Sequence, residues 1–165
     1  MYDAVSDSRT IVAAIDRVFT VATAEEAASL DGVVQAIARE RGRPLTVSKD
    51  DSMPPGVFGQ WTHFADRDEV SYAPWVYKVD RTVAHEMGHI VLGHRGRPVV
   101  DLAQSILPES MHGLAALMLR RECGSAGDAD EETAAEQFAG MLLNRLQFGS
   151  RGAPRLRSRW GEAFS

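Results

Sequence analysis

The chain has 165 residues, of which 44% are hydrophobic and 25% charged, and its formal net charge at pH 7 is -5. This length and composition are typical of one globular domain with a hydrophobic core. The acidic balance argues against nucleic acid as the main partner, because a phosphate-binding surface needs clustered Lys and Arg. The single cysteine, Cys123, excludes an internal disulfide. With neither a secretory signal nor an apolar run of about 20 residues, we expect a cytoplasmic protein without a membrane partner.

The first part of the chain predicts two helices. Hydrophobic residues recur at helical spacing over residues 9–20, which predicts the first helix. Thr23 and Glu26 resemble a capping box, which would open a second helix. That helix would run to about Arg41, with Gly42 as its natural stop.

Short strands should follow these helices. Residues 45–47 are β-prone, and segments 57–64 and 69–72 flank a polar turn over residues 65–68. The pattern predicts a small, mostly antiparallel sheet. The segment at 69–72 is also a candidate for pairing with an extended substrate by strand addition.

The second half of the chain is mainly helical in its pattern. A helix should end at Leu92 with Gly93 as its C-cap, and residues 108–121 form a second amphipathic segment. Asp130 is a plausible N-cap for a last long helix that ends near Gly149. This order of helices, a small sheet and further helices is typical of the α+β class.

A zinc-binding motif, HEMGH, occupies residues 85–89. Residues four apart lie on one face of a helix, so His85 and His89 can direct two imidazoles at one ion. Glu86 is displaced just enough to reach a water on that ion. The helix is otherwise largely apolar, and a metal supplies partners for the polar atoms of two buried histidines. We therefore expect one zinc ion per chain.

The third protein ligand has two candidates. His94 comes one residue too early for the longer motif HExxHxxGxxH, and after a helix end at Gly93 it should point away along the exit loop. Glu132 instead projects from the apolar face of the last helix. Glu136 lies one turn further and can contact the second nitrogen of a ligand histidine. The glutamates also suit a solvated first helical turn, but the upstream motif favours Glu132 as the ligand.

The segments HEMGHIVLGH (85–94) and ETAAEQFAGMLL (132–143) together resemble the ImmA/IrrE family of zinc metallopeptidases. Members carry HExxH and a later helix with ExxAN or ExxAD. The resemblance implies a zincin-like core in which His85, His89 and Glu132 bind zinc and Glu86 is the catalytic carboxylate. Members often cleave a repressor that contains a helix-turn-helix, so the resemblance suggests a regulator of this kind as substrate. This chain departs from the family at position 136, where it has Glu, and in its long segment 95–129.

These observations predict one metallopeptidase-like domain over residues 1–149 and a basic C-terminal tail over 150–165. The domain should contain N-terminal helices, a small sheet, the HExxH helix and a C-terminal helix that carries the third ligand. The expected activity is zinc-dependent hydrolysis of peptide bonds in a protein substrate. The alternative is a zinc-stabilised regulatory or binding protein that engages a partner without proteolysis. The intact Glu86 favours catalysis, and one cysteine does not suit a closed structural zinc site.

Overall fold

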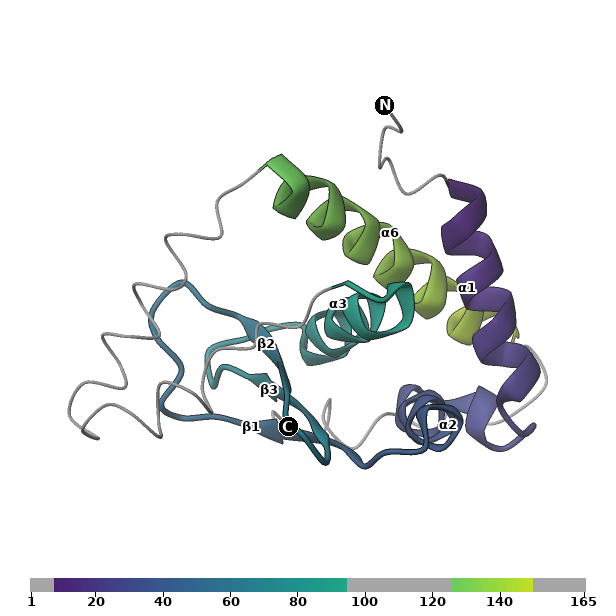
Figure 1. Cartoon of the computed structure of the whole chain (residues 1–165), viewed down its shortest axis with the longest axis horizontal. Helices are drawn as coiled ribbons and strands as arrows, with labels where there is room; N and C mark the ends of the chain where they lie inside the picture. The colour runs from purple at the N-terminus through teal and green to yellow at the C-terminus, as the bar shows by residue number, and fades with distance from the viewer. Residues whose placement is uncertain (1–7, 95–125, 150–165) are drawn as a thin grey trace.

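The computed structural model describes residues 8–94 and 126–149, excluding the side chains of 126–128. The predicted segment over 108–121 and the basic tail over 150–165 lie outside these residues. The described elements confirm the α+β class (Figure 1). They are, in chain order, α1 (Ser8–Val21), the 3-10 helix η1 (Glu26–Ala28), α2 (Leu30–Arg41), β1 (Leu45–Lys49), β2 (Gly59–His63), β3 (Asp68–Tyr72), α3 (Val79–Leu92) and α6 (Ala126–Gly149).

The capping box forms, but it caps η1 and not α2. The Thr23 N–H donates to Glu26 Oε2 at 2.8 Å, and the Glu26 N–H donates to Thr23 Oγ1 at 3.2 Å. Ser29 then adopts an extended conformation, and its Oγ accepts a hydrogen bond of 3.0 Å from the Gly32 N–H. The predicted start of the second helix was therefore wrong, because Ser29 interrupts the helix and is itself the N-cap of α2, which begins at Leu30.

The interaction of Glu26 with Arg39 predicts a pH-dependent contribution to stability. A hydrogen bond from Arg39 and one from the Thr23 N–H lower the pKa of Glu26 from 4.5 to about 2. A depressed folded pKa gives stability that is present above the ordinary pKa and lost as pH falls toward 2. Glu26→Gln should therefore make the free energy of unfolding less dependent on pH between about 4.5 and 2. Urea unfolding at several pH values measures this, with Glu25→Gln as control. Parallel curves for wild type and Glu26→Gln would contradict the assignment.

Two glycines end their helices as predicted. Gly42 follows α2 with φ of 64°, and Gly93 follows α3 with φ of 72°. Both values lie in the left-handed region that residues with a side chain rarely adopt. The ends of α2 and α3 are thus determined locally, which explains why the sequence pattern located them.

The sheet has the strand order β1-β3-β2. Strand β2 is antiparallel to β3, with Trp61 opposite Val70, whereas β1 is parallel to β3, with Val47 also opposite Val70. The prediction of a mostly antiparallel sheet was therefore wrong, since the sheet is mixed. The hairpin β2–β3 is a local feature, but the side on which β1 joins it depends on long-range packing. Because β3 is paired along both sides, the segment at 69–72 cannot accept an additional strand.

A buried carboxylate ties the sheet to the end of α2. Asp68 is fully buried at the start of β3, and its Oδ1 lies 3.1 Å from Trp61 Nε1 and 2.6 Å from His63 Nδ1. Its Oδ2 lies 3.0 Å from Arg41 Nη2 and 3.1 Å from Arg43 Nε. Burial alone would raise the pKa of Asp68, but the hydrogen bonds from its neighbours outweigh burial and lower it. The sequence pattern predicted only a polar turn over residues 65–68 and did not indicate this buried network of hydrogen bonds and ion pairs.

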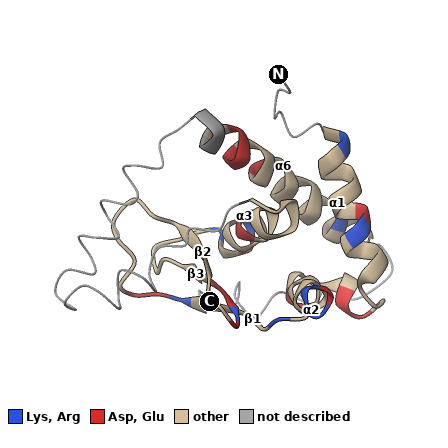
Figure 2. Ribbon diagram, viewed as in Figure 1, with Lys and Arg blue, Asp and Glu red and all other residues tan. Residues whose placement is uncertain are grey.

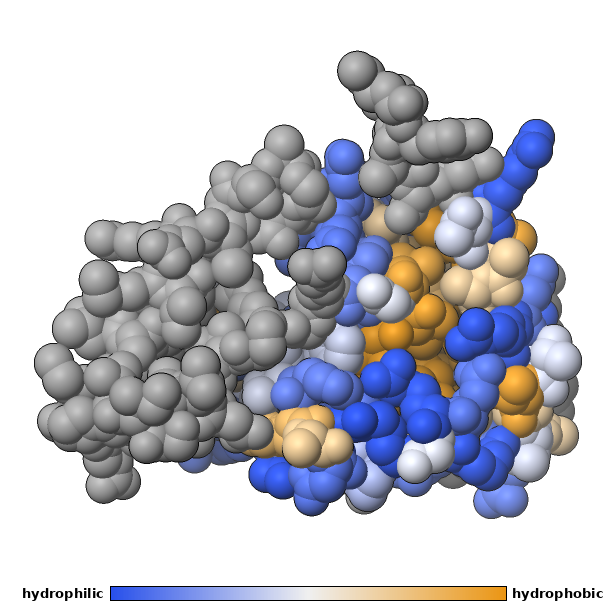
Figure 3. Space-filling model, in the orientation of Figure 1, coloured by the Kyte–Doolittle hydropathy of each residue, from blue (hydrophilic) through white to orange (hydrophobic). Residues whose placement is uncertain are grey.

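Helix α3 lies between the sheet and α6, and α1 packs on the C-terminal half of α6 (Figure 1). The interior faces of α3 and α6 are fully or almost fully buried and carry Val83, Ala84, Met87, Ile90, Ala135, Phe138, Ala139 and Leu142. Hydrophobic residues are visible where α1, α3 and α6 meet (Figure 3). Within the described residues, no helix is both long enough and apolar enough to cross a membrane.

Candidate metal centre

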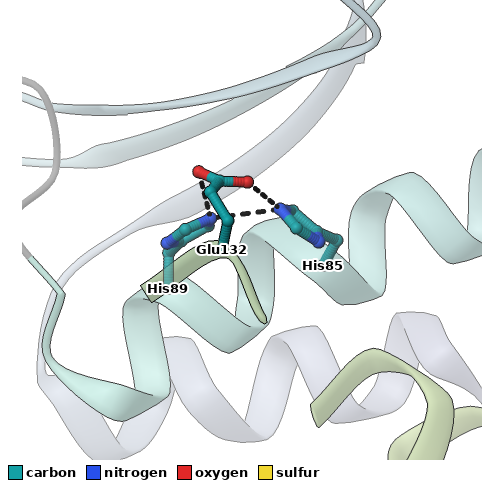
Figure 4. A group of neighbouring side chains, drawn as sticks. All are labelled: His85, His89 and Glu132. Carbon is teal, nitrogen blue, oxygen red and sulfur yellow. Dashed lines mark hydrogen bonds and ion pairs between the residues drawn. The ribbon is translucent and has the colours of Figure 1, made fainter. Parts of the chain in front are cut away.

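The two histidines of the motif lie on one face of α3, as their spacing predicts (Figure 4). Their Nε2 atoms are 3.1 Å apart, and the two rings meet edge to face at a centroid distance of 4.9 Å. Both side chains are mostly buried, with 20% of the His85 side chain and 14% of the His89 side chain exposed. Two imidazole nitrogens therefore converge on one point at the surface of the helix.

Glu132 reaches this point from α6. Its Oε2 lies 3.1 Å from His85 Nε2, and its Oε1 lies 3.4 Å from His89 Nε2. One potential ligand atom from each of His85, His89 and Glu132 lies within 4.8 Å of the others, and these three residues are called the donor group.

Helix α6 begins at Ala126, so the prediction of Asp130 as its N-cap was wrong. Glu132 thus sits in the second turn of a helix that starts before the acidic run.

The distances between the donor atoms suit a zinc ion. Zinc binds imidazole nitrogen and carboxylate oxygen at about 2.0–2.1 Å with tetrahedral geometry, which places the ligand atoms about 3.3 Å from one another. The two Nε2 atoms are 3.1 Å apart, and each faces its own oxygen of Glu132, Oε2 at 3.1 Å from His85 and Oε1 at 3.4 Å from His89. Two imidazoles and one carboxylate also form the donor set of catalytic zinc sites that leave a fourth position open. The residues therefore fit zinc in their chemistry, and their ligand atoms lie within the distance at which three groups could hold one metal ion.

Gly88 allows α6 to come close enough for Glu132 to reach the histidines. A Cβ at this position would lie 3.0 Å from both Cα and the carbonyl oxygen of Ala135, and 3.3 Å from its Cβ. Gly88 is fully within α3, and Ala135 lies one helical turn after Glu132. Since backbone atoms oppose the missing side chain, the close approach of the two helices depends on glycine here.

Gly88→Ala should therefore weaken zinc binding without changing any ligand. The added methyl group must separate α3 from α6, and overpacking of this kind costs about 1–3 kcal/mol of stability. We expect a lower melting temperature and a lower zinc affinity, measured by competition with a chromophoric chelator. Gly140→Ala is the matched control, because a Cβ there meets no atom within 4 Å. Equal zinc affinity for Gly88→Ala and wild type would show that the helix separation does not position Glu132.

The second nitrogen of each histidine also has a neighbour. His85 Nδ1 lies 3.3 Å from Glu136 Oε2, the contact predicted for an outer carboxylate. Arg81 donates a hydrogen bond to the other oxygen of Glu136, and this bond is the main cause of the lowered pKa of Glu136. A hydrogen bond that His85 donates to the Glu132 carboxylate is in turn the main cause of the raised pKa of His85. The sequence interpretation did not identify Arg81, whose role depends on the packing of α3 against α6.

His94 turns back toward the site instead of away from it. Its Nδ1 lies 2.9 Å from His89 Nδ1, and the two rings are 5.0 Å apart. The predicted direction of this side chain was therefore wrong, although the predicted end of α3 at Gly93 is confirmed. The left-handed conformation of Gly93 reverses the chain and brings His94 beside the last turn of the helix. His94 contacts the side of His89 that faces away from Glu132, so it orients His89 and is not part of the donor group.

Glu86 lies on the side of α3 that faces the sheet. Only 8% of the residue is exposed, and its carboxylate lies beside Gly59 at the start of β2. Its negative charge contributes to raising the pKa of the neighbouring His85 imidazole. The carboxylate therefore acts electrostatically on His85 but is not part of the donor group.

Acidic residues gather in the N-terminal half of α6, the part of the helix that carries Glu132 (Figure 2). They include Asp130, Glu131, Glu132 and Glu136. Negative charge around the donor group favours a divalent cation.

Comparisons with known proteins leave the site to be interpreted from its geometry. No family model matches the sequence, and neither a curated protein nor a solved structure matches the chain.

Proposed function

We propose that this chain is a zinc-dependent endopeptidase of the ImmA/IrrE type that hydrolyses peptide bonds of a protein substrate. One observation carries the proposal: His85, His89 and Glu132 form a donor group, and the motif glutamate, Glu86, is buried on the same helix, where its charge acts on His85. The two segments that resemble the family are 47 residues apart at His85 and Glu132, yet these side chains are in contact.

The chemistry follows from the roles that these side chains can take. When bound, zinc acts as a Lewis acid and lowers the pKa of a water molecule to near neutrality. Glu86 accepts a proton from the attacking water and later delivers it to the leaving amine. Glu136 and His94 hold the rings of His85 and His89, so that Nε2 of each ring faces the centre.

An extended substrate has a suitable place to bind. Among the described strands, β1 and β2 form the two edges of the sheet, and β2 packs against α3 next to Glu86. A peptide that pairs with the edge of β2 that no other described strand occupies would lie beside α3, with affinity from main-chain hydrogen bonds. We therefore assign the substrate-binding edge to β2 and not to the segment at 69–72.

The substrate class that the family resemblance suggests is a regulator with a helix-turn-helix, acted on in the cytoplasm. The test is a comparison of new protein N-termini in cells that express wild type or Glu86→Gln at equal levels. Wild type should generate N-termini that are absent with Glu86→Gln. If both strains give the same N-termini and the same phenotype, the peptidase proposal fails and the zinc-stabilised binding protein replaces it.

A further inference from the structure

Gly59, the first residue of the edge strand β2, faces helix α3 at very short range. A Cβ at this position would lie 2.5 Å from Thr82 Cγ2, 2.9 Å from Glu86 Oε1 and 3.4 Å from Glu86 Cγ. Gly59 does not have a positive φ, unlike Gly42, Gly56 and Gly93, so the backbone itself does not require glycine. The requirement at Gly59 is for space.

The space that Gly59 leaves is taken up by two side chains of α3. Thr82 and Glu86 are four residues apart and therefore lie on the same face of the helix. The Thr82 hydroxyl lies 3.4 Å from the carbonyl oxygen of Lys78, the N-cap of α3, while the methyl group of Thr82 lies toward Gly59. Glu86 is buried at this contact. A side chain at position 59 would therefore press on both the threonine methyl group and the glutamate carboxylate.

The position of this carboxylate matters for a general base. Such a group must lie about 2.6–3.2 Å from the atom whose proton it takes. A displacement of about 1 Å can reduce the rate about a hundredfold. Glycine in a strand often marks a close approach of this kind.

We propose that Gly59 is a positioning residue for Glu86, since its missing side chain leaves the space in which the carboxylate is held beside the donor group. The catalytic consequence rests on the proposed peptidase function, but the contact itself does not. Gly59 thus connects the strand assigned to substrate binding with the residue assigned to proton transfer.

The contact can be tested without any activity, in metal-free protein. All variants carry Thr82→Ser, which removes the methyl group at 2.5 Å. Gly59→Ala is then measured in the presence of Glu86 and in a Glu86→Ala background. We expect Gly59→Ala to lower the melting temperature by about 2–8 °C when Glu86 is present, because overpacking destabilises. The loss should largely disappear with Glu86→Ala. An equal loss in both backgrounds would overturn the contact.

The positioning role needs a second readout. In zinc-loaded protein, Gly59→Ala with Thr82→Ser should reduce kcat about a hundredfold, with KM and zinc affinity close to those of Thr82→Ser alone. Gly140→Ala should leave kcat unchanged. Unchanged kcat for Gly59→Ala with Thr82→Ser would overturn the positioning role. If Glu86→Gln itself turned over substrate like wild type, the proposed function would fail, whereas the melting temperatures would still decide the contact.

Discussion

Glu86→Gln should fold and bind zinc like wild type but hydrolyse its substrate about 10²–10⁴ times more slowly, the usual contribution of general-base catalysis. Glutamine keeps the size and hydrogen bonding of glutamate but cannot accept the proton. Glu86 is not one of the three donor residues, so the metal should stay. The measurement compares zinc content, melting temperature and single-turnover rate on a substrate identified by N-terminal mapping.

Two other results for Glu86→Gln would each indicate a different role for Glu86. If Glu86→Gln lost zinc together with activity, the carboxylate would contribute to metal binding. If it kept full activity, proton transfer would depend on another group. The Gln substitution is preferred to Ala because Glu86 is buried between α3 and β2. A cavity left by Ala would confuse a catalytic effect with a packing effect.

Glu132→Ala should lose most of the zinc affinity, because it removes one of the three proposed protein ligands. Structural zinc sites with four ligands bind with about 10–16 kcal/mol, which is roughly 2.5–4 kcal/mol per ligand, or about 10²–10³-fold. Competition with a chromophoric chelator measures this loss. Glu131→Ala changes the adjacent residue of the same helix and carries the same loss of charge, so it is the matched control. A similar loss for both variants would point to general electrostatics instead of ligation by Glu132.

The residues of the donor group could be predicted because their signals are local. The four-residue spacing of His85 and His89 needs only a helix, and Glu132 lies on the apolar face of a second helix. Gly88 could not be recognised in this way. Its role depends on the backbone of Ala135, which is 47 residues further along the chain, and no local pattern shows that the two helices meet there.

Other features escaped prediction for the same physical reason. Asp68 was assigned to a polar turn, but its carboxylate is buried by Trp61, His63 and two arginines from different elements. His94 was expected to point away along the exit loop. The left-handed conformation of Gly93 instead reverses the chain and directs the His94 side chain toward His89. The parallel pairing of β1 with β3 joins segments that are not adjacent in the chain, so no local pattern indicates it.

The most direct test of the metal centre is X-ray absorption at the zinc edge of the zinc-loaded protein. A site formed by His85, His89 and Glu132 should give only nitrogen and oxygen neighbours at about 2.0–2.1 Å. Scattering from two imidazole rings should also be present. A zinc–sulfur distance of about 2.3 Å would instead bring Cys123 into the site. Scattering from three imidazole rings would indicate that the third ligand is another histidine and not Glu132. Either result would contradict the proposed metal centre.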